Sequence, residues 1–133
     1  MRLETDLETI DDVDEAGLRR ALATLGSDRN TRAILSVADE IYIQTATFDN
    51  GFVIEKREGD EASHFHAVPP HGPLAPWREK PKRSWWERVL NPSDFLVSEC
   101  AFEKDEMIAA FARYLHGREG DLGLEWSQGY CDR

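Results

Sequence analysis

The sequence feature that most constrains the fold is a pair of strand-like segments joined by Asp49-Asn50-Gly51. Residues 41–48 (IYIQTATF) are rich in β-branched and aromatic side chains, and residues 52–57 form the return segment. Asn-Gly tolerates the positive φ angles of a type I′ turn, so the three pieces together predict a β-hairpin.

Other segments extend this hairpin into a larger antiparallel sheet. Glu58-Gly59-Asp60-Glu61 predicts a second chain reversal after the return strand, because such residues favour turns. Strand character recurs before and after the hairpin, in the segments 32–37, 63–68 and 94–100, and edge strands are expected over residues 3–9 and 122–126. The central part of the chain is therefore expected to form a meander.

Two segments have the i, i+3, i+4, i+7 apolar spacing of an amphipathic helix. The first follows the acidic pair Asp11-Asp12 and is expected to stop at Gly26. The second runs from about Lys104 to His116 and is closed by Gly117. The apolar positions are Leu18, Ala21, Leu22 and Leu25 in the first, and Ile108, Phe111, Ala112 and Leu115 in the second.

Residues 69–92 differ in kind from the rest of the chain. They hold all six prolines and three of the four tryptophans, and their lysines and arginines exceed their acidic residues. Prolines at this density exclude a regular strand ladder in the first half of the segment, although residues 84–90 could form a short helix. Such a long insertion is usually functional or covers the core.

These patterns together predict a single α+β domain over residues 1–133. An antiparallel β-meander sheet is expected to pack against the two amphipathic helices, with the Pro/Trp-rich loop inserted before the second helix. We find no internal repeat and no second domain.

The net charge of −10 narrows the choice of partner. A pI near 4.8 argues against nucleic acid and against anionic membranes, because both need a basic surface. It favours a partner with a positively charged face, although an acidic surface can also serve only to keep the protein soluble.

The first ten residues lack the apolar core of a secretory signal, and Cys100 and Cys131 lack metal-binding spacing, so a cytoplasmic protein with reduced thiols is expected.

Histidines offer the best candidate for a metal site. His64 and His66 fall on one face of a strand and His71 follows in the loop, which is a possible start of a zinc site. No fourth ligand stands at a convincing spacing. The simpler interpretation is that both strand histidines are exposed, opposite a buried Phe65, and we expect no metal and no cofactor.

The sequence contains no glycine-rich phosphate loop, no CxxC, no HExxH and no serine elbow. The strand histidines with a carboxylate at Glu58 or Glu61 could form a general acid–base pair, but this combination is common in small acidic proteins. We therefore expect no catalytic residues and a protein that is not an enzyme.

Two groups of residues are candidates for binding a protein partner. Tryptophans dominate binding hot spots, which favours Trp77, Trp85 and Trp86, although at least one of the adjacent pair could cover the core instead. Carboxylates at exposed loop tips are positioned for a basic partner, and this criterion selects Asp49, Glu58, Asp60 and Glu61.

The order of these pieces resembles a known family. The helix segment IDDVDEAGLRRALATL precedes the meander RAILSVADEIYIQTATFDNGFVIEKREG, and DFLVSEC, KDEMIAAFARYLHG and LGLEW follow. Between Ile10 and Trp126 this arrangement is similar to the first-described immunity-protein family of bacterial polymorphic toxin systems, in particular to the immunity protein of a double-stranded-DNA cytosine deaminase toxin.

The resemblance implies an α+β fold and a small cytoplasmic antidote that binds a toxin domain one to one. It carries over no catalytic residue, because the family is not enzymatic. The longer Pro/Trp-rich insertion departs from the family pattern and leaves the toxin unidentified. Two rival hypotheses stay open, namely an adaptor or effector chaperone that binds through the Pro/Trp loop, and a small metal-dependent enzyme built on the three histidines.

Overall fold

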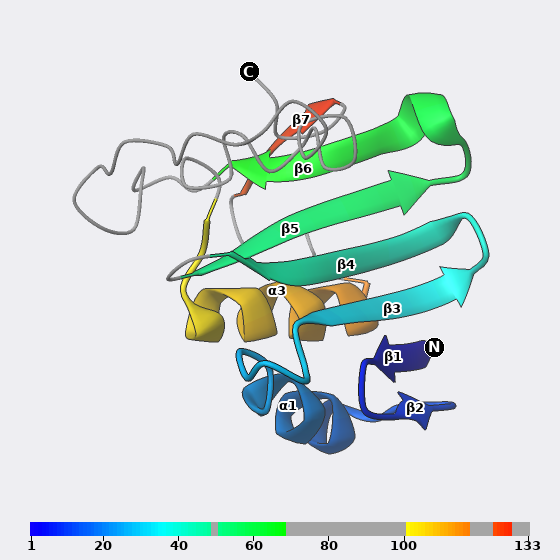
Figure 1. Ribbon diagram of the computed structural model, residues 1–133. Coiled ribbons are helices and arrows are strands. Elements are labelled where there is room, and N and C mark those ends of the chain that lie inside the picture. Colours follow the sequence, from blue (N-terminus) through cyan, green and yellow to red (C-terminus); the bar gives the residue numbers. More distant parts are fainter. Residues whose placement is uncertain (49–50, 69–100, 118–123, 129–133) are drawn as a thin grey trace, which may run out of the picture.

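The computed structural model describes residues 1–48, 51–68, 101–117 and 124–128 of the chain. These residues form an α+β fold in which a seven-stranded antiparallel sheet packs against two helices (Figure 1). The strands and helices, in chain order, are β1 (Arg2–Thr5), β2 (Thr9–Ile10), α1 (Glu15–Ala23), β3 (Arg32–Ala38), β4 (Ile41–Phe48), β5 (Gly51–Glu58), β6 (His64–Val68), α3 (Lys104–Leu115) and β7 (Glu125–Gln128), with the short 3-10 helix η1 (Glu61–Ser63) before β6.

The sheet has the order β2-β1-β3-β4-β5-β6-β7, and each neighbouring pair is antiparallel. The run from β3 to β6 is the predicted meander. The hairpin is also confirmed, but Phe48 pairs with Gly51, so the return strand begins one residue earlier than predicted. Residues 49–50, which the turn prediction also covers, lie outside the described residues.

Both ends of the chain add to the sheet in ways that the sequence patterns predicted only in part. The opening segment makes two short strands around a turn at residues 6–8, and β1 pairs with β3 rather than forming the sheet edge. The C-terminal strand is an edge strand as expected, but it begins at Glu125 and pairs with β6. The predicted strand over residues 94–100 and the short helix over 84–90 lie outside the described residues.

One face of the sheet forms the core. Directly paired residues of an antiparallel sheet share a face, and the fully buried row Leu3, Leu35 and Ile43 crosses β1, β3 and β4. The helices pack on this face through the predicted apolar stripes, which include Leu18, Leu22, Ile108, Phe111 and Ala112. We call the opposite side of the sheet the outer face.

The helix ends follow their capping residues. Asp14 caps α1 by accepting a hydrogen bond from the Gly17 amide at 2.7 Å, and α1 ends at Ala23, three residues before the predicted stop at Gly26. Gly26 instead bends the following loop with a φ of 109°. Helix α3 starts at Lys104 as predicted, with a reciprocal capping box between Glu103 and Glu106.

Candidate partner-binding surface

The turns β3–β4 and β5–β6 lie at the same end of the sheet, on the right in Figure 1. They contact each other directly, because the Gly59 amide donates a hydrogen bond of 2.8 Å to the Glu40 carbonyl oxygen. Gly59 adopts a φ of 119°, which favours glycine over residues with a side chain. The backbone conformation of Gly59 and its hydrogen bond to Glu40 therefore hold the two turns next to each other.

Four exposed carboxylates stand on these two turns, and we call them the acidic turn surface: Asp39, Glu40, Glu58 and Asp60. Two of them are matched by cations from β5. The Arg57 guanidinium lies 2.6 Å from Glu40, and the Lys56 ammonium lies 2.8 Å from Glu58. Both cationic side chains are largely buried, so the surface that a partner would meet is mainly carboxylate.

The remaining two carboxylates give this surface its excess charge. Among the described residues, Asp39 and Asp60 have no cation within ion-pair distance. Asp60 is nevertheless held in place, since its carboxylate accepts a hydrogen bond of 2.9 Å from the Ser63 amide and caps η1. The surface thus combines negative charge with a defined backbone geometry.

The structure brings together only part of the predicted binding set. Glu58 and Asp60 share the acidic turn surface, and Glu61 opens η1 beside them, although its side chain is not among the described ones. Asp49, in the predicted hairpin turn, belongs to the part of the chain that the structure does not describe. Trp77, Trp85 and Trp86 lie outside the described residues.

Sequence reasoning did not select Asp39 and Glu40 as candidate binding residues. Both stand between two strand-like segments, which was a usable signal for an exposed turn. Their position beside Gly59 depends on the pairing of β3, β4 and β5, which brings the two turns to one edge.

The expected exposure of the strand histidines is wrong. His64 and His66 are only 3% and 6% exposed, and Phe65 between them is half-buried. Lys56 pairs with the core residue Ile43 and therefore lies on the core face. Its neighbours Glu55 and Arg57 point to the opposite face, and they pair with His66 and His64. Both imidazoles therefore lie on the outer face. The His64 Nε2 atom lies 2.5 Å from Glu55 Oε2, so this ring nitrogen and the carboxylate are hydrogen-bond partners in the buried site.

Glu55 is not part of the acidic turn surface. Its side chain lies on the outer face of the sheet, beside His64, and not on a turn. Within the described part of the chain, no three His, Cys, Asp or Glu side chains are grouped closely enough to hold a metal ion. His71, the third member of the predicted metal set, lies outside that part, as do both cysteines.

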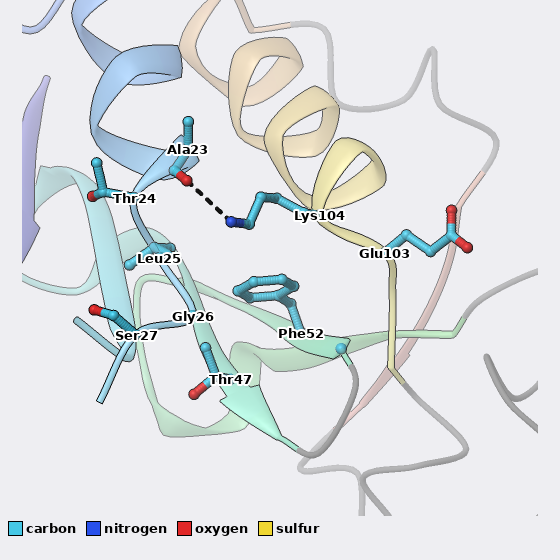
Figure 2. Close-up of a pocket in the computed structure, with 10 residues that line it drawn as sticks. Ala23, Thr24, Leu25, Gly26, Ser27, Thr47, Phe52, Glu103 and Lys104 are labelled. Carbon is cyan, nitrogen blue, oxygen red and sulfur yellow. Dashed lines mark hydrogen bonds between the residues drawn. The ribbon is translucent and has the colours of Figure 1, made fainter. Parts of the chain in front are cut away.

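Figure 2 shows a hollow of about 680 Å³. It opens at the end of the sheet opposite the acidic turn surface, where β4 ends and β5 begins. It lies between the end of α1, the start of β5 and the start of α3, and Phe52 and Leu25 contribute its apolar lining. The ammonium of Lys104 donates a hydrogen bond of 3.0 Å to the Ala23 carbonyl oxygen across it. Lys104 thus acts as a link between the two helices.

A smaller groove separates the helices near the other end of α3. There His116 Nε2 lies 2.6 Å from Glu15 Oε1, and Arg19 Nε donates to the second oxygen of Glu15 at 3.0 Å. The hydrogen bond from His116, followed by that from Arg19, lowers the pKa of Glu15 below its ordinary value. This contact joins α1 to α3 and presents no nucleophile.

Comparison with known proteins gives no relative. No protein-family model, no curated protein and no solved structure matches the chain. Among the described residues, no helix is long and apolar enough to cross a lipid bilayer.

Proposed function

We propose that this chain is an immunity protein, which binds a toxin domain and neutralises it by covering a positively charged active-site region. The observation that supports the proposal is the acidic turn surface, where four exposed carboxylates stand on two turns held together by the Gly59–Glu40 hydrogen bond. The resemblance to the immunity family supplies the class of partner.

Complementary charge supports this choice of partner. An enzyme that attacks nucleic acid needs a basic cleft to hold phosphates, and a carboxylate surface competes for the same cations. A chain with a net charge of −10 also attracts such a partner over a distance, which raises the association rate. Fast association suits an antidote, because the toxin must be bound before it acts.

The direct test is protection of growing cells. The partner is first recovered with the tagged full chain from its native cell, and its toxic domain is then expressed with and without this protein. We expect growth to be restored by the wild type. Equal killing in both cultures would reject the proposal.

A matched pair of variants tests the surface itself. Asp39→Asn, Glu58→Gln and Asp60→Asn remove three charges while retaining side-chain oxygens for the η1 cap and for Lys56. The control removes three charges from exposed residues elsewhere: Glu8→Gln, Asp28→Asn and Asp105→Asn. We expect protection to weaken for the first variant and to persist for the control.

A further inference from the structure

Two large aliphatic side chains are exposed at the acidic end of the sheet. Val37 is 56% exposed and Ile41 is 40% exposed, and with Leu7 they are the large hydrophobic residues left exposed in the described part of the chain. Leu7 belongs to the β1–β2 turn, at the other end of the sheet. Two of these three exposed hydrophobic residues therefore lie next to the acidic turn surface.

A β-bulge places Val37 next to Ile41. The β3–β4 ladder pairs Ser36 with Tyr42 and then Ala38 with Ile41, so Val37 is the extra residue opposite the step between Ile41 and Tyr42. Bulges redirect side chains and are frequent beside functional sites. A regular strand would not have brought an additional aliphatic side chain to this position.

Carboxylates surround the aliphatic pair. Asp39 and Glu40 stand between Val37 and Ile41 along the chain, and Glu58 is the ladder partner of Ile41 on the other side. An apolar centre with a charged rim is the usual anatomy of a protein-binding surface, in which the centre supplies most of the affinity.

We propose that Val37 and Ile41 form the apolar anchor of the partner interface. The occupant is a protein segment that presents one aliphatic or aromatic side chain between lysine or arginine residues. This inference rests on the proposed function, because it assumes a basic protein partner. A second copy of the chain is disfavoured, since two acidic turn surfaces would then face each other.

The test uses two peptides and nuclear magnetic resonance on the isotope-labelled full chain. One amidated seven-residue peptide carries leucine between two pairs of lysines, and the other carries glycine in place of leucine. We expect the leucine peptide to bind about five-fold more tightly, which corresponds to partial burial of one leucine side chain. Its largest shifts should fall on the amides and methyl groups of Val37 and Ile41.

Threonine substitutions identify the anchor without disturbing the strands. Val37→Thr with Ile41→Thr keeps β-branching at both exposed positions and should reduce the leucine peptide to the affinity of the glycine peptide. Leu7→Thr is the control at the third exposed hydrophobic residue and should leave the difference intact. The charge-removing variant D39N/E58Q/D60N should weaken both peptides alike.

Equal affinities for the two peptides, no binding of the leucine peptide at millimolar concentration, or shifts centred elsewhere would overturn the anchor. Protection of cells measures the proposed function separately. A wild type that protects cells while its peptide affinities are equal would leave the immunity function standing and reject the anchor alone.

Discussion

At the scale of single residues, Lys56 shows how a charged side chain can belong to the core face. It lies beside Ile43 in the ladder and is almost completely buried. Its ammonium reaches Glu58 at 2.8 Å and lies 4.4 Å from the ring centre of Trp126, with Phe65 at 5.7 Å. The aliphatic part of the side chain is therefore packed in the core, while the ammonium group contacts the Glu58 carboxylate and the ring of Trp126.

This contact predicts a measurable coupling between β5 and the last strand. Lys56→Met retains the stem and Trp126→Leu retains apolar contact, so the double variant isolates the cation–π term. We expect a coupling free energy of about 1 kcal/mol in urea unfolding of the wild type, both single variants and the double variant. Additive losses would show that Lys56 and Trp126 contribute independently.

Asp6 provides a second residue-scale prediction, which concerns acid stability. Hydrogen bonds from the Thr31 amide at 2.8 Å and the Thr31 hydroxyl at 3.0 Å, followed by the Arg32 guanidinium, lower the pKa of Asp6 from 3.8. A lowered folded-state pKa stabilises the fold above pH 3.8, and this contribution is lost as the pH falls through the folded-state value.

Asp6→Asn should therefore lower the melting temperature at pH 7, and the difference from the wild type should shrink below pH 3.8. Melting curves between pH 2 and pH 7 measure this. Asp28→Asn, at an exposed loop residue, is the control for the loss of one carboxylate, and Asp6→Asn should show the larger change with pH because Asp6 accepts the Thr31 hydrogen bonds. A difference for Asp6→Asn that is independent of pH would contradict the assignment.

At the scale of elements, the acidic turn surface depends on how two hairpins end. The β3–β4 turn supplies Asp39 and Glu40, and the β5–β6 turn supplies Glu58 and Asp60. A backbone hydrogen bond from the Gly59 amide to the Glu40 carbonyl oxygen joins them. The conformation of Gly59 therefore controls both stability and the spacing of the carboxylates.

Gly59→Ala should destabilise the protein by about 1–2 kcal/mol, because a φ of 119° strains any residue with a Cβ atom. Gly117→Asn is the comparison, since its φ of 69° lies in the left-handed region that asparagine tolerates. Urea unfolding gives both values. Equal losses at the two positions would show that backbone conformation does not explain the effect.

Strands and helices were predictable from sequence where residues close together in the chain determine them. The β-branched and aromatic residues of 41–48 predicted β4 with its observed bounds, and the apolar stripe of the second helix predicted its start at Lys104. The stop at Gly26 failed because a glycine two residues beyond the C-cap Thr24 marks the loop rather than the helix end.

The arrangement of the candidate surface was less predictable, because it depends on pairing between strands. Glu40 and Glu58 belong to different hairpins along the chain, and only the pairing of β3, β4 and β5 brings them to one end of the sheet. The burial of His64 follows from a side-chain contact with Glu55, nine positions away on the neighbouring strand. No spacing rule along a single strand reveals a contact of this kind.

At the scale of the whole molecule, the hydrophobic core and the acidic turn surface occupy different regions. The core lies between the helices and one sheet face, whereas the acidic turn surface lies at one end of the sheet (Figure 1). Long-range attraction depends on total charge, and short-range contacts depend on the end surface.

Binding kinetics should separate these contributions. Against the recovered partner, the D39N/E58Q/D60N variant should associate about ten-fold more slowly at low salt, because rim charges act mainly on encounter. The difference should narrow in 0.5 M salt, where screening is strong. Stopped-flow measurement with the E8Q/D28N/D105N control checks this, and identical rates for the two variants would mean that only net charge matters.

The bond between the Gly59 amide and the Glu40 carbonyl is made by backbone atoms alone. Asp39 and Val37, which are exposed beside this bond, can therefore change their side chains without breaking the link between the turns, whereas the Glu40 side chain is held by its ion pair with Arg57. Selection can then alter what this end of the sheet recognises while the folding free energy stays nearly constant. If the protein has the proposed function, a lineage that meets a changed partner can follow it by single substitutions at these positions.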